Sequence, residues 1–91
     1  MQVKLYASLR QAAGTKMLEV DVQTNRAIRD ILAEVTQRYP VLTKYVWSDS
    51  GALVDYVRVF VNSENIRHLD GLDTLVRSDD HVDIFPPLVG G

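Results

Sequence analysis

The amino-acid sequence predicts an α+β domain, with a mixed sheet of about five strands and one main helix on one face. Three observations carry this prediction. Apolar and polar residues alternate near both ends of the chain, and a central segment has apolar residues at helical spacing. The length of 91 residues suits one compact domain rather than two.

The N-terminal segment predicts a hairpin of two strands. Residues 3–8 alternate between apolar and polar side chains, which is typical of a half-buried strand. Residues 11–15 then read as a short connection that contains Gly14, a residue able to adopt positive φ. Residues 17–22 alternate again and predict the second strand.

The next segment predicts one amphipathic helix of about 14 residues. Thr24 is the expected N-cap, and Pro40 ends the helix. Residues 41–46 are compatible with a further helical turn, and residues 47–52 are typical of a loop. The apolar stripe of the helix consists of Ile28, Ile31, Leu32, Val35 and Tyr39.

The second half of the chain predicts three further strands. Residues 56–61 alternate and form the third strand, and residues 66–69 suggest a short fourth strand after a turn. Residues 72–76 form an apolar crossing segment. Residues 81–85 form the last strand, because Pro86 and Pro87 cannot donate to a strand ladder.

This order of elements predicts a β-grasp (ubiquitin-like) roll. One helix can cover only one face of the sheet, so the other face must meet solvent or a partner. We expect the last strand to pair in parallel with the first at the sheet centre. Residues 1–85 are the expected domain, and residues 86–91 the expected flexible C-terminal tail.

Composition excludes several classes of function. The formal net charge is −2 and the basic residues are scattered, which argues against nucleic acid as a partner. The chain has no cysteine, so it has no thiol nucleophile and no disulfide. No apolar run approaches the length of a membrane span, and the first residues do not look like a signal peptide, so we expect a cytoplasmic protein without membrane contact.

Side-chain catalysis and metal binding are not expected. His68 and His81 lack metal-ligand spacing and read as surface residues beside turns. Asp79, Asp80 and Asp83 fit a turn followed by a solvated strand face better than a cation site. We therefore expect no metal.

The chain's last residues carry the candidate chemistry. Pro86–Pro87 holds the exit from the sheet extended, and Gly90–Gly91 follow. Glycine has no Cβ, so the Gly91 carbonyl is open to attack once its carboxylate has been activated, for example by adenylation with ATP. A frayed terminus is the structural alternative, because glycine is common there.

Several segments together resemble the MoaD/ThiS family, the sulfur-carrier branch of the ubiquitin-like proteins. The resemblance covers essentially the whole chain, and its middle is most similar to the CysO-like subgroup. The segments that carry it are residues 3–10 followed by Ala13–Gly14, residues 38–42, residues 57–67 with 69–74, and the ending 80–91.

The resemblance implies a β-grasp carrier protein and not an enzyme. Such a carrier can also be the small subunit of a sulfur-transfer enzyme such as molybdopterin synthase. Gly91 would be adenylated by an E1-like enzyme that uses ATP and Mg, then converted to a thiocarboxylate by a sulfur donor. Pro87, Leu88, Val89 and Gly90 would enter the partner's active site. An acceptor synthase for molybdopterin, thiamine or cysteine biosynthesis would take the sulfur, and no cofactor would be bound tightly.

The alternation along the strands also predicts a docking surface for these partners. If the apolar residues of the third and last strands face the helix, the residues between them face outward and form an aromatic patch. Alternatively, these aromatic residues are exposed singly and have no binding role. The predicted patch consists of Tyr6, Tyr56, Arg58, Phe60, Asp83 and Phe85.

Two other functions remain open from the sequence. The chain can be a protein modifier, joined through Gly91 to lysines of target proteins, because the activation chemistry is the same. It can also be a binding subunit whose tail is inert.

Overall fold

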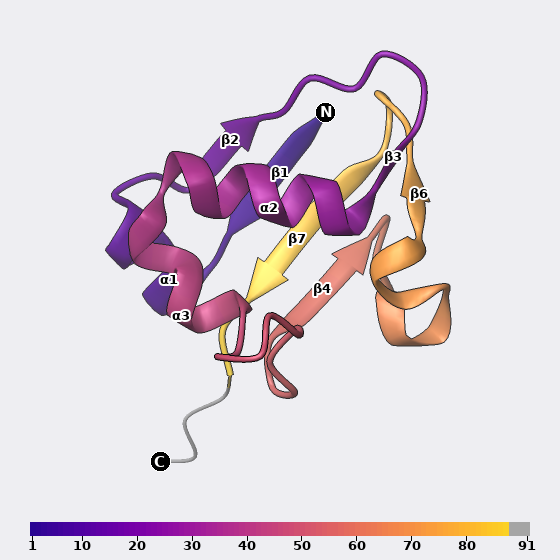
Figure 1. Ribbon diagram of the computed structural model, residues 1–91. Helices are drawn as coiled ribbons and strands as arrows, with labels where there is room; N and C mark the ends of the chain where they lie inside the picture. The colour runs from indigo at the N-terminus through magenta and orange to yellow at the C-terminus, as the bar shows by residue number, and fades with distance from the viewer. Residues whose placement is uncertain (88–91) are drawn as a thin grey trace.

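The computed structural model describes residues 1–87, and its centre is a five-stranded mixed sheet (Figure 1). The strands lie in the order β2-β1-β7-β4-β5. This arrangement confirms the α+β class and the β-grasp roll that the sequence predicted. The bounds are Gln2–Leu5 for β1, Met17–Glu19 for β2, Arg58–Val61 for β4, Glu64–Asn65 for β5 and His81–Phe85 for β7.

The first and last strands pair in parallel at the centre of the sheet, as predicted. Val3 lies opposite Val82 and Leu5 opposite Ile84. Strand β4 runs antiparallel on the other side of β7, with Val59 opposite Ile84. Because side chains alternate along a strand, these residues point to one face, where each is at most 2% exposed.

Helix α2, Ile28–Arg38, covers this apolar face (Figure 1). Its predicted stripe is confirmed in the core, where Ile28, Ile31, Leu32 and Val35 are 0% exposed. The further helical turn is also confirmed, as the 3₁₀ helix η1 at Pro40–Leu42 and helix α3 at Thr43–Val46. Within residues 1–87, no helix is long and apolar enough to cross a membrane.

A short helix, α1 at Ala7–Ala13, stands where the sequence predicted the end of a strand and a plain connection. That prediction was wrong beyond Leu5. Ala7 has φ of 51°, a left-handed conformation that turns the chain out of the sheet. Leu9 is 0% exposed and anchors α1 in the core, and Gly14 ends the helix with φ of 74°.

The start of α2 also differs from the prediction. The helix begins after Ala27, which has no side-chain cap, and not after Thr24. The preceding Arg26–Ala27 form strand β3, which pairs with strand β6, Leu75–Val76, in a separate two-stranded sheet. This pairing holds the backbone extended up to the helix. Residues 72–76, expected to cross the fold, thus supply a strand.

The predicted fourth strand at residues 66–69 is wrong. Strand β5 covers only Glu64–Asn65, and Ile66–His68 form the 3₁₀ helix η2. The Asn65 side chain accepts a hydrogen bond from the Arg67 backbone N–H at 2.9 Å, which favours a helical start over a continued strand. The third 3₁₀ helix, η3, follows at Gly71–Asp73.

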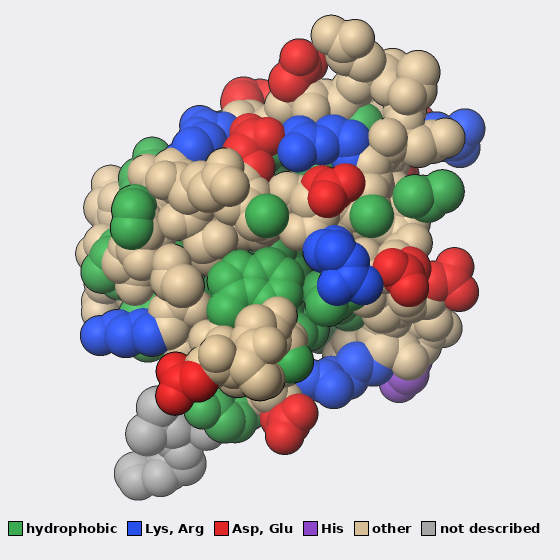
Figure 2. Space-filling view, in the orientation of Figure 1, with side chains coloured by type: hydrophobic (Ala, Val, Ile, Leu, Met, Phe, Trp, Pro, Cys, Tyr) green, Lys and Arg blue, Asp and Glu red, His purple; other side chains and the backbone are tan. Residues whose placement is uncertain are grey.

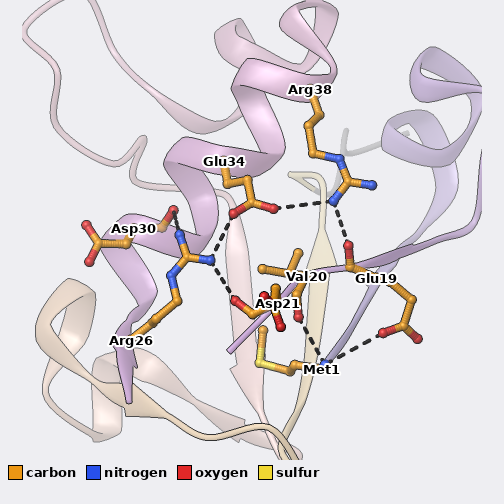
Figure 3. A network of polar contacts seen from close by, with 8 residues as sticks. All are labelled: Met1, Glu19, Val20, Asp21, Arg26, Asp30, Glu34 and Arg38. Carbon is orange, nitrogen blue, oxygen red and sulfur yellow. Dashed lines mark hydrogen bonds and ion pairs between the residues drawn. The ribbon is translucent and has the colours of Figure 1, made fainter. Parts of the chain in front are cut away.

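A polar network fastens α2 to the long connection that precedes it (Figure 3). Arg26 donates to Glu34 at 2.8 Å and to the Asp21 carbonyl at 3.0 Å. Arg38 donates to Glu34 at 3.4 Å and to the Glu19 carbonyl at 2.6 Å. One glutamate thus pairs with two arginines, and the connection is held over the helix by charge-assisted hydrogen bonds.

Candidate functional site

The outer face of the sheet, which α2 does not cover, carries five partly exposed side chains that contact one another. Arg58 and Phe60 on β4 lie opposite Phe85 and Asp83 on β7, and Tyr6 joins them from the end of β1. The residues between them on each strand are buried. We call this group, Tyr6, Arg58, Phe60, Asp83 and Phe85, the aromatic cluster.

The rings of the aromatic cluster pack in defined geometries around Phe85. Tyr6 stacks on Phe85 with ring centroids 4.2 Å apart and planes inclined by 12°. Phe60 meets Phe85 edge-on, at 5.5 Å and 84°. The Arg58 guanidinium lies 5.7 Å from the Phe85 ring centre, within the range of a cation–π interaction. Phe85 is therefore held from three sides, which limits the loss of side-chain freedom when a partner covers it.

A hydrogen bond joins two members of the aromatic cluster, Tyr6 and Asp83. The Tyr6 hydroxyl donates to Asp83 Oδ1 at 2.9 Å. This bond, together with partial burial and the negative charge of Asp83, raises the pKa of the Tyr6 phenol. The hydroxyl therefore stays protonated at neutral pH, and Asp83 is already oriented by a neighbour before any partner arrives.

Tyr56 does not belong to the aromatic cluster. It was predicted on the outer face of the third strand, but β4 begins only at Arg58. Tyr56 is 62% exposed and, within residues 1–87, makes no ring contact with the cluster.

The chain leaves the sheet beside the aromatic cluster. Because β1 and β7 are parallel, their C-terminal ends meet at one edge, where the Tyr6 N–H donates to the Ile84 carbonyl at 3.2 Å. Pro86 is buried and Pro87 is half-buried. The predicted tail residues Leu88, Val89, Gly90 and Gly91 lie outside the described residues.

Sequence reasoning missed a hollow of about 230 Å³ at the same edge. Its lining combines Met17, Tyr6 and the edge of Leu5, whose side chain is buried in the core, with three cations. The sequence does contain three basic residues within the first 16, but only helix α1 brings the second of them, Arg10, close to the other two. The three cations are Lys4, Arg10 and Lys16.

Asp80, one of the acidic residues that the sequence placed in a turn, serves local structure. Asp80 accepts hydrogen bonds from the Arg77 backbone N–H at 2.7 Å and from Asn62 Nδ2 at 2.8 Å, and both lower its pKa. The Arg77 contribution is the larger. Within residues 1–87, no three acidic or histidine side chains gather as metal ligands would.

Comparisons with known proteins extend over the whole chain. The sequence model of the ThiS family matches residues 3–91. Small archaeal modifier protein 1 from Haloferax volcanii is 32% identical over 91 residues, which are 100% of both chains. A protein from Archaeoglobus fulgidus, named for a proposed sulfur-carrier role, is 34% identical over 100% of this chain and 98% of its own.

A solved structure agrees with the fold described above. The solution structure of small archaeal modifier protein 1 from Methanosarcina acetivorans superposes with a TM-score of 0.87 at 35% identity. The superposition covers 99% of this chain and 94% of that one.

Proposed function

Since this chain belongs to the ThiS family of ubiquitin-like sulfur carriers, we propose that it carries sulfur as a thiocarboxylate at Gly91. The chain is a carrier or modifier and not a catalyst, so partner proteins supply the chemistry. A carboxylate oxygen of Gly91 attacks the α-phosphorus of ATP in an E1-like adenylyltransferase, and pyrophosphate leaves. Sulfide from a donor then attacks the acyl carbonyl, AMP leaves, and a thiocarboxylate remains.

One observation carries the proposal: the family match continues through the Gly90–Gly91 pair to residue 91. The absence of cysteine is consistent with it, because no side-chain thiol can take the sulfur instead. The absence of Cβ atoms beside the reacting carbonyl lets a thiolate or an amine approach it from either face.

The aromatic cluster supports the proposal as a docking surface for the activating enzyme and for the acceptor synthase. It lies beside Pro86, where β7 ends. Its aromatic and arginine side chains are the types that contribute most at protein interfaces. A partner that binds the cluster holds the end of the sheet in place while Pro87, Leu88, Val89 and Gly90 enter its active site.

ATP and Mg belong to the activating enzyme in this proposal, and this chain binds no cofactor tightly. Consumption of ATP fits a cytoplasmic protein. The acceptor is a small-molecule precursor in cysteine, molybdopterin or thiamine-type biosynthesis.

A second function shares the same activated Gly91: attachment to target lysines through an isopeptide bond. The names of the relatives from Haloferax volcanii and Methanosarcina acetivorans favour it, since both are called modifiers. Immunoblots of cell extract separate the two functions. A ladder of high-mass conjugates that disappears when Gly91 is deleted supports the modifier, and its absence supports the carrier alone.

The carrier proposal is tested by intact mass spectrometry. The protein is incubated with an E1-like enzyme from its own genome, ATP, Mg and sulfide. We expect one oxygen to be replaced by sulfur in the wild type and in the remote control Lys44→Gln, but not after deletion of Gly91. An unchanged wild-type mass, under conditions in which the enzyme activates another carrier, would show that the tail is inert.

A further inference from the structure

The basic hollow beside Tyr6 is formed by three elements that the backbone brings together. Lys4 is the outward residue of β1, opposite Met17 of β2. The left-handed turn at Ala7 starts α1, which carries Arg10, and the turn at Gly14 returns the chain to Lys16. The Leu5 N–H donates to the Lys16 carbonyl at 2.9 Å and closes the loop.

The charges of this hollow are not neutralised by the described part of the chain. Lys4, Arg10 and Lys16 are exposed, and no ion pair within residues 1–87 includes any of them. Asp83 is the residue opposite Lys4 on β7, and its Oδ1 accepts the Tyr6 hydroxyl.

On the helix-covered face, by contrast, several basic side chains form ion pairs with acidic ones. Figure 2 shows acidic and basic side chains interleaved there. Arg26 and Arg38 both pair with Glu34, and Arg29 pairs with Asp73 at 3.0 Å. In a chain with a net charge of −2, the hollow is distinguished by gathering three cations that form no ion pair within residues 1–87, although Asp83 lies opposite one of them, Lys4.

We propose that the hollow lined by Lys4, Arg10 and Lys16 receives an acidic side chain of a partner protein, with an apolar side chain next to it. The cations attract a carboxylate, and Met17 and Tyr6 offer apolar contact that a free oxyanion would not use. The volume of about 230 Å³ suits one or two side chains, since small-molecule sites are larger, about 300–1,000 Å³.

The hollow is continuous with the aromatic cluster, which favours an acidic protein segment over a small anion as its ligand. Tyr6 lines the hollow and also stacks on Phe85, so a single partner surface can cover both regions. This inference rests on the proposed function, because it assigns the hollow to the protein that handles the tail. The cluster then provides apolar contact, while the hollow steers the encounter and selects partners by charge.

Nuclear magnetic resonance titration of the intact protein tests the inference without any enzyme. The probes are acetyl-Leu-Glu-Asp-Leu-amide, its neutral counterpart acetyl-Leu-Gln-Asn-Leu-amide, and inorganic phosphate. We expect the acidic peptide to shift the amide signals of Lys4, Arg10, Lys16 and Met17, with weaker binding at higher salt. Equal shifts from the neutral peptide, or equal affinity for phosphate alone, would overturn the assignment to an acidic protein segment.

A matched pair of variants provides the control. Lys4→Gln with Lys16→Gln should weaken binding of the acidic peptide about three- to ten-fold, since exposed charge pairs contribute modestly. Lys44→Gln with Arg77→Gln removes the same charge elsewhere and should leave binding unchanged. Equal affinity in both double variants would refute the inference.

The same variants keep this inference separate from the proposed function. With the E1-like enzyme, Lys4→Gln with Lys16→Gln should raise KM for this protein about three- to ten-fold and leave kcat unchanged. If the wild type acquires sulfur and the variant matches it in KM, the hollow is not a docking site although the carrier function holds. If the wild type acquires no sulfur, the carrier function fails, and the peptide titration still decides the chemistry of the hollow.

Discussion

The hydrogen bond between Tyr6 and Asp83 allows a test of the aromatic cluster that needs no partner. Tyr6→Phe removes the hydroxyl that lies 2.9 Å from Asp83 Oδ1 but keeps the ring that stacks on Phe85. A net hydrogen bond to a charged group contributes about 1.5–3 kcal/mol, and partial exposure reduces this to about 1 kcal/mol. In a domain of this size, that loss corresponds to a fall in Tm of about 4–8 °C.

The pH dependence of this difference has a definite sign. The pKa of Tyr6 is raised in the folded protein, so the fold favours the protonated phenol. The stabilisation is therefore fully present below the unfolded tyrosine pKa of about 10 and is lost as the pH rises through the folded pKa. We expect the stability curves of the wild type and Tyr6→Phe to run parallel below about pH 10 and to converge above it.

Chemical denaturation across pH, with tyrosinate absorbance in parallel, measures both quantities. Asp83→Asn and the double variant complete a thermodynamic cycle, in which we expect a coupling free energy of about 0.5–1 kcal/mol. Asp83→Asn should also lower the Tyr6 pKa, because it removes the hydrogen bond to the carboxylate and the charge that opposes ionisation. A coupling of zero, or a Tyr6 that ionises at the ordinary tyrosine pKa of about 10, would refute the geometry of the cluster.

Three further predictions address the aromatic cluster, the acid dependence of stability and the unpredicted helix α1. Phe60→Asp should lower affinity for the E1-like enzyme at least ten-fold in calorimetry with a small change in Tm, and an unfolded variant would mean that Phe60 is core. Asp80→Asn should destabilise by about 1 kcal/mol at neutral pH; because the folded pKa of Asp80 is lowered, this difference should shrink as acid protonates it below about pH 4, and a constant difference would contradict the assignment. Leu9→Ala should destabilise by about 2–5 kcal/mol in urea unfolding, whereas an effect below about 1 kcal/mol would mean that α1 is not anchored in the core.

The sheet and the main helix were predictable because long-range burial imposes a regular period on them. Val59 and Ile84 pair across two strands and are both at most 1% exposed, and the alternation on either side of them identified the strands and their parity. The central position of the last strand followed from the order of elements in a β-grasp fold. The same parity placed Arg58, Phe60 and Phe85 on the outer face before any contact was known.

The remaining elements show no regular spacing of apolar residues in the sequence. Helix α1 has a single fully buried residue, Leu9, and Ala7 continued the strand pattern although its φ of 51° ends the strand. Strands β3 and β6 are two residues each, too short for alternation to be detected. The sequence alone named Tyr6 and Phe85 but not their stacking, and it missed the hollow beside them, which depends on that unpredicted turn.

The parallel pairing of β1 and β7 explains why the aromatic cluster and the end of β7 share one edge. Parallel strands end together, so Phe85 on β7 and Tyr6 after β1 arrive side by side, and their rings stack at 4.2 Å. The polypeptide must leave this edge twice, once through Ala7 into α1 and once through Pro86. An antiparallel pair would have separated these two exits by the length of a strand. The central pairing therefore gathers the cations of the hollow, the rings of the aromatic cluster and the end of β7 within the reach of a single partner.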